Sequence, residues 1–147
     1  MIFKVEDKKE YSKDIAVIEK HCFSTPWTDE QIKNSDDSTV FFVAKTEEKI
    51  VGYAGMYTVL DEGYVTNIGV MPNFRRKGIG KKLLENLLEY SAELKLEFLS
   101  LEVRVTNIAA ITLYETFGFE KMGERKDFYS NPKENALIMT RFLKNGR

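Results

Sequence analysis

The sequence predicts a single α/β domain in which helices flank a mixed sheet. The main observation is a strand–loop–helix unit from Asn67 to Tyr90, followed by another apolar strand. Residues 39–45 and 50–60 are two further β-rich runs, and the polar turn between them indicates a hairpin. Strands and helices therefore mix around a strand–helix–strand unit, which is typical of an α/β layer. We expect one domain covering residues 1–147.

Composition narrows the class of protein. Hydrophobic residues make up 43% of the 147 residues and charged residues 31%, as in ordinary globular proteins. The net charge of −1 and the lack of a recognised motif argue against a nucleic-acid partner. A charged N-terminus and the lack of a long apolar run predict neither a signal peptide nor membrane association. We therefore expect a cytoplasmic protein.

His21 and Cys22 are the single histidine and the single cysteine. One cysteine excludes an internal disulfide, and this pair does not supply a zinc ligand set. Adjacent helical residues also point in different directions, so the two do not form a nucleophilic pair. We expect no metal cofactor, with Cys22 in the core and His21 at a helix end.

Two helices are expected before the first strand. Apolar residues at helical spacing predict one from Lys9 to Cys22, and Pro26 breaks the pattern. Thr28 to Gln31 has the form of a capping box, which starts a short second helix. Trp27 is interpreted as a core residue, with a place in a substrate wall as the alternative.

The strand Tyr64–Val70 leads into a basic glycine loop. Gly78 and Gly80 lack Cβ atoms, so a ligand can approach the backbone closely. The loop also opens a helix, where unpaired N–H groups and the helix dipole favour an anion. Five basic residues surround this point: Arg75, Arg76, Lys77, Lys81 and Lys82. The loop predicts a phosphate site, and a solvated basic helix start is the alternative.

The spacing of this loop excludes two common nucleotide motifs. A Walker A loop needs Ser or Thr where Lys82 stands, and a glycine where Arg75 stands. A dinucleotide fingerprint needs a third glycine where Leu83 stands. The remaining pattern is Arg75-x-x-Gly78-x-Gly80.

The second half of the chain supplies two candidate catalytic groups. Glu102 lies within the apolar strand predicted for Phe98–Val105, where a carboxylate must be solvated, paired or used. An ion pair with Arg104 or a neighbour is the alternative. Tyr114 lies on the apolar stripe of a helix that Asn107 caps, so a core tyrosine with a bonded hydroxyl is its alternative. The final expected elements are a helix end at Gly118, strands Phe119–Glu124 and Glu134–Phe142, and an irregular segment Arg125–Lys133.

Several separated motifs, in order, resemble the GNAT acetyltransferase family over nearly the whole chain. The resemblance is closer to its RimI branch, the ribosomal-protein-alanine N-acetyltransferases. Besides the glycine loop, the matching segments are 23–28 (FSTPWT), 67–70 (NIGV), 101–104 (LEVR), Asn107, 109–111, 113–115 and 117–119. The resemblance implies a GNAT-like fold, with a mixed, mostly antiparallel sheet flanked by helices.

The resemblance also implies acetyl-CoA as co-substrate. Backbone groups of the strand would bind the acetyl-pantetheine arm, and the glycine loop would bind the pyrophosphate. The cofactor-binding residues implied are Ile68, Gly69, Val70, Arg75, Arg76, Lys77, Gly78, Ile79, Gly80, Lys81 and Asn107. Gly69 stands where alanine is common in the family, and Arg75 where glutamine is frequent, but neither removes a backbone role.

By the same resemblance Glu102 is the general base and Tyr114 the general acid. Acetyl transfer needs a neutral amine, and an α-amino group with a pKa of about 7.7–8.0 is partly neutral at pH 7. Neither cysteine nor serine is needed as nucleophile, so we expect direct transfer in a ternary complex. The implied acceptor is the N-terminal alanine of the eighteenth protein of the small ribosomal subunit. The alternatives are another protein N-terminus, a lysine or a small-molecule amine, and, in another class, a non-catalytic CoA-binding module.

Overall fold

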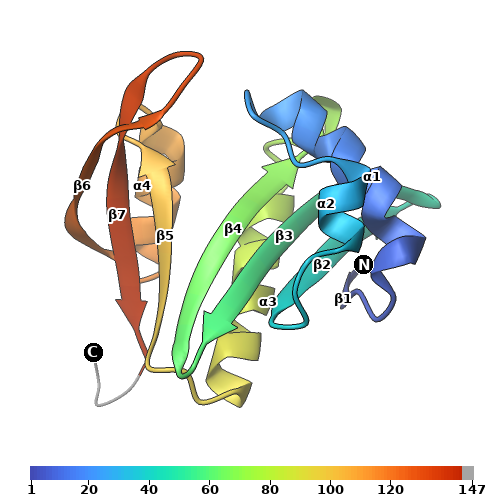
Figure 1. Cartoon of the computed structure of the whole chain (residues 1–147), viewed down its shortest axis with the longest axis horizontal. Coiled ribbons are helices and arrows are strands. Elements are labelled where there is room, and N and C mark those ends of the chain that lie inside the picture. Colours follow the sequence, from blue (N-terminus) through green and yellow to red (C-terminus); the bar gives the residue numbers. More distant parts are fainter. Residues whose placement is uncertain (144–147) are drawn as a thin grey trace.

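A computed structural model of the protein describes residues 1–143 and contains one seven-stranded sheet with strand order β1-β2-β3-β4-β5-β7-β6 (Figure 1). The strands are β1 (Ile2–Lys4), β2 (Thr39–Thr46), β3 (Lys49–Val59), β4 (Glu62–Val70), β5 (Phe98–Arg104), β6 (Glu120–Tyr129) and β7 (Glu134–Phe142). The helices are α1 (Lys8–Cys22), α2 (Asp29–Lys33), α3 (Ile79–Glu93) and α4 (Ile108–Thr116), with a short 3-10 helix η1 (Pro72–Phe74). Within residues 1–143 no helix has the length and apolar character that a bilayer-spanning helix needs.

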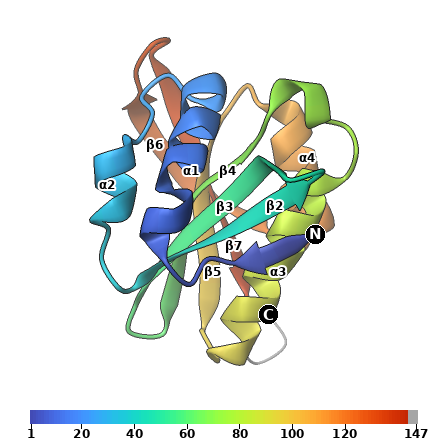
Figure 2. The same cartoon turned by 90° about the vertical axis from the view of Figure 1, so that its right-hand side faces the viewer.

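Helices cover both faces of the sheet and divide the core in two (Figures 1 and 2). On one face Ile15 and Ile18 of α1 pack with Phe41 and Tyr53 of the sheet. On the other face α3 supplies three fully buried leucines, and α4 joins the same cluster through Ile111. Burial of these apolar stripes is the main stabilising contribution to a layered fold of this kind. This arrangement places the C-terminal end of α1 and the N-terminal end of α3 close to Val70, at the end of β4.

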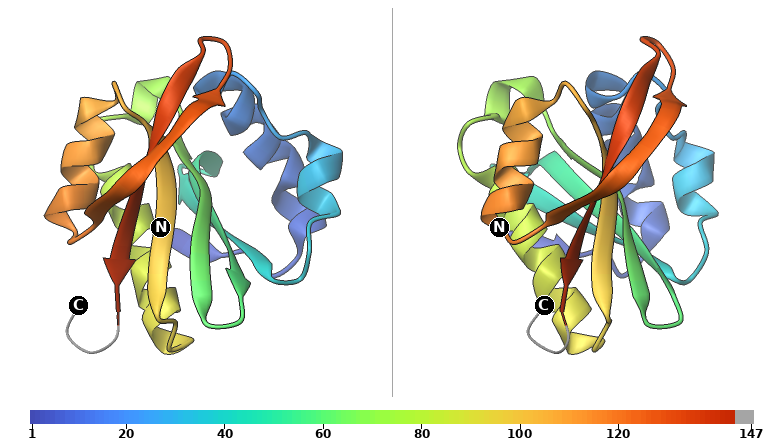
Figure 3. Two further views of the ribbon diagram at one scale, coloured as in Figure 1. Left: turned by 60° about the vertical axis from the view of Figure 1, so that its left-hand side comes forward. Right: turned by 90° about the vertical axis from the view of Figure 1, so that its left-hand side faces the viewer.

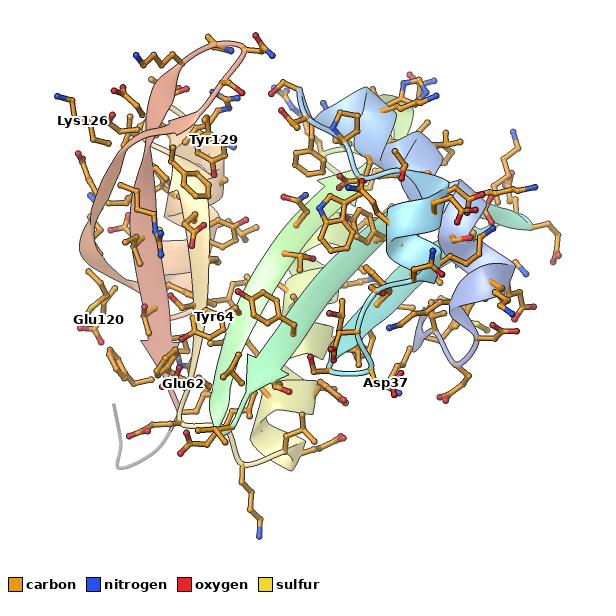
Figure 4. All side chains as sticks on the ribbon, in the orientation of Figure 1. Asp37, Glu62, Tyr64, Glu120, Lys126 and Tyr129 are labelled. Carbon is orange, nitrogen blue, oxygen red and sulfur yellow. The ribbon has the colours of Figure 1, made fainter. Side chains whose placement is uncertain are left out.

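Strands β4 and β5 pair over only a short stretch. They are parallel neighbours at Glu62–Tyr64 and Phe98–Ser100, whereas every other strand pair is antiparallel. Glu62 and Tyr64 lie low on β4, at this closed end (Figure 4). Beyond them the two strands diverge, as Figure 3 shows from the side of β6 and β7. A bulge in the β3–β4 ladder, with Thr66 as the extra residue, bends β4 within the diverging part.

Most predicted elements are confirmed, including the mixed sheet, the 39–60 hairpin and the capping box at Thr28. Two differences stand out. The strand β1 was not expected, because three partly buried residues carry too little periodicity to be recognised. The prediction of an irregular segment is wrong for residues 125–129, which continue β6. This strand is exposed almost throughout, so it has no alternating apolar pattern, and its ladder with β7 holds it.

Candidate active site

Three adjoining cavities lie where β4 and β5 diverge. The central cavity, about 220 Å³, is lined from both strands and from α4. The loop-side cavity, about 550 Å³, extends from it toward the glycine loop. The hairpin-side cavity, about 580 Å³, lies between the segment after α1 and the β6–β7 hairpin. Cys22 and Phe23 line all three cavities, which therefore form one continuous passage across the sheet edge.

The glycine loop is shaped to leave backbone groups open. Arg76 and Gly78 both have left-handed backbone angles, with φ of 63° and 80°. Gly78 is the N-cap of α3 and provides no side-chain cap, so the first N–H groups of the helix remain available. A Cβ built at Gly78 would meet nothing within 4 Å, so the space above this backbone is free for a ligand. The side chains of Arg76, Lys77 and Lys81 are exposed around it.

Arg75 differs from its basic neighbours. Its Nε donates to the Val70 carbonyl at 2.9 Å, and its Nη2 lies 3.4 Å from the Cys22 sulfur. The side chain is therefore turned back along the end of β4 and lines the loop-side cavity. Cys22 in turn is half-buried and lies against the same carbonyl at 3.4 Å. As expected, Cys22 packs against the core cluster of α1, but it is only partly buried, because α1 ends at the rim of the passage.

The edge of β4 presents backbone groups to the passage. The N–H of Met71 donates to Val51 of β3 at 2.8 Å, and alternation along an antiparallel strand then directs the N–H groups of Ile68 and Val70 away from β3. Both residues line the cavities. At Gly69, between them, a Cβ would lie 3.1–3.3 Å from side chains of α1 and Phe23. Close packing of α1 on β4 explains a glycine here.

Glu102 and Tyr114 both line the central cavity, from β5 and α4 respectively. The Glu102 side chain is 32% exposed, and its carboxylate lies 3.9 Å from Nε of Arg125. The ion pair considered from the sequence therefore forms with Arg125, since Arg104 pairs with Glu134 at 3.2 Å. Burial, and secondarily the nearby Tyr129, raises the pKa of Tyr114 to about 12.

The Tyr114 hydroxyl makes no hydrogen bond within residues 1–143, in contrast to what a core tyrosine would show. Asn107 lines both the central and the loop-side cavities. Its side-chain oxygen caps α4 by accepting from the Ala110 N–H at 3.2 Å. The structure thus brings part of the expected site to one passage: Ile68–Val70, Arg75, Gly80, Glu102, Asn107 and Tyr114 line it. The other expected donor-binding residues, Arg76–Ile79 and Lys81, are not among the residues that line these cavities.

Arg104 ties two loops together over the hairpin-side cavity. Its Nη1 donates to the Pro132 carbonyl at 2.8 Å, its Nη2 to the Ser24 hydroxyl at 3.2 Å, and its guanidinium lies over the Tyr129 ring at 4.4 Å. Ser24 also donates to the Ser130 carbonyl at 3.1 Å. Tyr129 lies on the side of the hairpin that faces this cavity, whereas Lys126 lies on the outer side (Figure 4).

Glu19 is a further buried group that the sequence reasoning did not identify. It is 0% exposed and contacts Tyr53 and Asn67. Its signal was present in the sequence, because Glu19 lies four residues after Ile15 and so falls on the stripe of α1 that carries the apolar residues Ile15 and Ile18.

The model of the acetyltransferase (GNAT) family matches residues 8–119. A curated relative from Escherichia coli (strain K12), named ribosomal protein bS18-alanine N-acetyltransferase, is 34% identical over 125 residues, which are 83% of this chain and 84% of the relative. This chain belongs to the GNAT family. A relative of the same name from Haemophilus influenzae is 35% identical over 130 residues, 86% of this chain and 88% of the relative.

Solved structures of GNAT proteins agree with this fold. The E. coli ribosomal-protein-S18-alanine N-acetyltransferase superposes with a TM-score of 0.87 at 30% identity, covering 97% of this chain and 94% of that one. A GNAT acetyltransferase from Elizabethkingia anophelis with acetyl-CoA bound has a TM-score of 0.78 at 20% identity, covering 97% of each chain, which supports the fold alone.

As a GNAT acetyltransferase, this chain uses acetyl-CoA as its acetyl donor. The open helix start at Gly78 and the unpaired edge of β4 fit such a molecule, since they offer N–H groups to phosphates and to amide or thioester oxygens. Residues 1–143 contain no group of three or more His, Cys, Asp or Glu side chains arranged to hold a metal ion.

Proposed function

We propose that this protein transfers the acetyl group of acetyl-CoA to the N-terminal amine of an alanine at the start of a small-subunit ribosomal protein. The observation that carries the proposal is the convergence of Glu102 and the unbonded Tyr114 hydroxyl on one cavity, at the unpaired edge of β4. A base, an acid and an N–H donor are then available on different sides of one reacting centre.

The acetyl donor is proposed to enter from the loop side. Gly78, Ile79 and Gly80 offer the N–H groups of the start of α3 to the pyrophosphate, and Arg76, Lys77 and Lys81 add positive charge. The pantetheine arm lies along Ile68–Val70 in place of a strand, with Asn107 on the opposite side. The Ile68 N–H then donates to the thioester oxygen and stabilises the negative charge that develops on it.

The amine is proposed to attack from the hairpin side. A neutral α-amine reaches the thioester carbon, and the proton that it loses passes to the Glu102 carboxylate, directly or through one water. Glu102 suits this role because its carboxylate borders the cavity and is partly solvated. The carbon–sulfur bond then breaks and releases the CoA sulfur with its electron pair.

Tyr114 is proposed to donate its hydroxyl proton to that sulfur. With a pKa of about 12 it stays protonated throughout the neutral range. An ordinary thiol has a pKa of about 8.5, and burial disfavours a tyrosinate as much as a thiolate, so the hydroxyl hydrogen-bonds the departing sulfur and gives up its proton only as the carbon–sulfur bond breaks. The proton taken up by Glu102 then returns to Tyr114 through solvent in the passage. The transfer is direct, and no acyl-enzyme is formed.

The acceptor assignment rests on the relatives. Both curated relatives described above carry the name bS18-alanine N-acetyltransferase and match more than four fifths of this chain. The tied loops over the hairpin-side cavity support a chain end as the acceptor, because a strand passing through would have to separate Ser24 from Ser130.

Initial-rate kinetics with a peptide that begins Ala-Arg tests this proposal. Direct transfer predicts intersecting double-reciprocal lines for acetyl-CoA and peptide, and fragmentation should place the acetyl group on the N-terminal nitrogen. Parallel lines with an acetylated enzyme would contradict direct transfer. Binding of acetyl-CoA without any transfer would instead indicate a non-catalytic CoA-binding module.

A further inference from the structure

The buried carboxylate of Glu19 is fully satisfied by three hydrogen bonds. Its Oε1 accepts from the Trp27 backbone N–H at 2.8 Å. Its Oε2 accepts from the Tyr53 hydroxyl and from Nδ2 of Asn67, the latter at 3.0 Å. These bonds join α1, the segment before α2, β3 and β4. An ionised carboxylate in the core is strongly destabilising without such partners, so the orientation of each donor is well defined.

This network sets the orientation of the Asn67 amide. A carboxylate only accepts hydrogen bonds, so Asn67 must turn its NH₂ group toward Glu19. Burial raises the pKa of Tyr53 well above its ordinary value, which keeps that hydroxyl a donor to Glu19 as well. The Asn67 side chain lines both the central and the hairpin-side cavities. Its Oδ1 is then the amide atom left for the passage, since the side-chain hydrogen bond that Asn67 makes within residues 1–143 uses Nδ2.

We propose that Asn67 binds the acceptor's amine through Oδ1 and that Glu19 is the positioning residue that keeps this oxygen facing the passage. An amine donates an N–H to Oδ1 and retains its lone pair for attack. Asn67 directly precedes Ile68, whose N–H faces the passage, and Glu102 lines the same central cavity. The amine, the thioester oxygen and the base are thereby placed around one centre. This inference rests on the proposed function, because it specifies how the acceptor of that reaction is held.

A pair of peptides tests the role of Asn67. One carries the free α-amine, and the other has the same sequence with the amine replaced by hydrogen, which makes it a competitive inhibitor. In Asn67→Ala the KM of the amine peptide should rise about tenfold or more, the scale expected for losing one hydrogen bond to an amine. The inhibition constant of the desamino peptide and the KM of acetyl-CoA should change less than about twofold.

Glu19→Gln tests the positioning role. The Gln side chain would place an NH₂ group where Oε2 lies, so Asn67 would have to reverse its amide and present N–H groups to the amine. The same selective rise in the KM of the amine peptide is expected. Tyr53→Phe is the matched control, because Tyr53 also donates to Oε2 of Glu19. Its loss leaves Oε2 an acceptor, so the Asn67 amide keeps its orientation and the KM of the acceptor peptide should stay nearly unchanged.

Each outcome is decisive. If Asn67→Ala weakens the binding of both peptides equally, Asn67 has a structural role and the inference is overturned. Acetylation of the free-amine peptide by the wild type would still leave the proposed function standing in that case. If the wild type acetylates no free-amine peptide, the proposed function and this inference both fail. If Glu19→Gln does not fold, the comparison of peptides with Asn67→Ala still decides the amine contact.

Discussion

Tyr64 and Ser100 are the last residues at which β4 and β5 pair. The proposed catalytic and donor-binding groups lie beyond this point, on strands that have separated, or on the helices and loops that border the opening. Edge groups that would otherwise bond a neighbouring strand are thereby available to a substrate. The separation depends on β5 pairing along its whole length with β7 instead.

Replacement of the proposed base should slow the chemical step. Glu102→Gln keeps the shape but cannot accept the amine proton, so kcat should fall by about 10²-fold or more, while the KM of acetyl-CoA stays nearly constant. Steady-state kinetics checks this. The control is Arg125→Gln, which removes the 3.9 Å ion pair with Glu102 and should change kcat only a few-fold. Equal losses in both variants would assign Glu102 an ion-pair role instead.

Tyr114→Phe should lower turnover and preserve acetyl-CoA affinity, because it removes only a hydroxyl that makes no hydrogen bond within the described residues. Calorimetric titration with acetyl-CoA and steady-state rates measure the two effects separately. A large loss of affinity with normal turnover would contradict the role as acid.

The ionisation of Tyr114 gives a pH-dependent prediction. The pKa of Tyr114 is about 12 in the folded protein and about 10 in the unfolded chain. Between pH 10 and pH 12 the unfolded chain has therefore lost this proton while the folded protein still holds it, so rising pH favours unfolding. The stabilising contribution of Tyr114 is complete below pH 10 and declines as the pH rises toward 12. Chemical denaturation between pH 9 and pH 11 should therefore show a steeper loss of stability in the wild type than in Tyr114→Phe. Identical slopes would indicate an unperturbed hydroxyl.

Obstruction of the glycine loop should weaken binding of the acetyl donor. Gly78→Val places a branched side chain in the open space above the start of α3, and we expect about tenfold or greater weakening of acetyl-CoA binding. Gly118→Ala is the control, since Gly118 also has a positive φ, of 84°, but lies outside the passage. It should lower the melting temperature and leave acetyl-CoA affinity unchanged. Unchanged binding in Gly78→Val would show that the loop is misassigned.

Loss of the Arg104 contacts that join the segment after α1 to the β6–β7 hairpin should weaken binding of the acceptor and leave binding of acetyl-CoA unchanged. Arg104→Gln loses most of the contacts to Ser24, Ser130 and Pro132, so the hairpin should move more freely over the cavity. The KM of the acceptor peptide should rise several-fold, with little change in the KM of acetyl-CoA, and protease should cleave the hairpin faster. An effect on acetyl-CoA instead would place this guanidinium in the donor site.

Local patterns in the sequence were sufficient for much of this architecture. The glycine loop, the capping box at Thr28 and the periodicity of α3 are short-range signals, and each predicted the observed element. Long-range pairings were not accessible in the same way. Which arginine would pair with Glu102 depended on the path of β6, and the contact of Glu19 with Asn67 depends on how α1 packs on β4. That Cys22 also lines the passage was not predicted, because helical spacing identifies the buried face of a helix but not where along the helix that face reaches the surface.

The most direct test of the proposed function is a competition assay read by mass spectrometry. The protein would receive acetyl-CoA and three peptides at equal concentration: one beginning with the free Ala-Arg end, one with a blocked N-terminus and internal lysines, and one beginning with an unrelated residue. We predict that the acetyl group appears on the first peptide alone, at its N-terminal nitrogen. Modification of a lysine in the blocked peptide would contradict N-terminal acetylation as the function of this site.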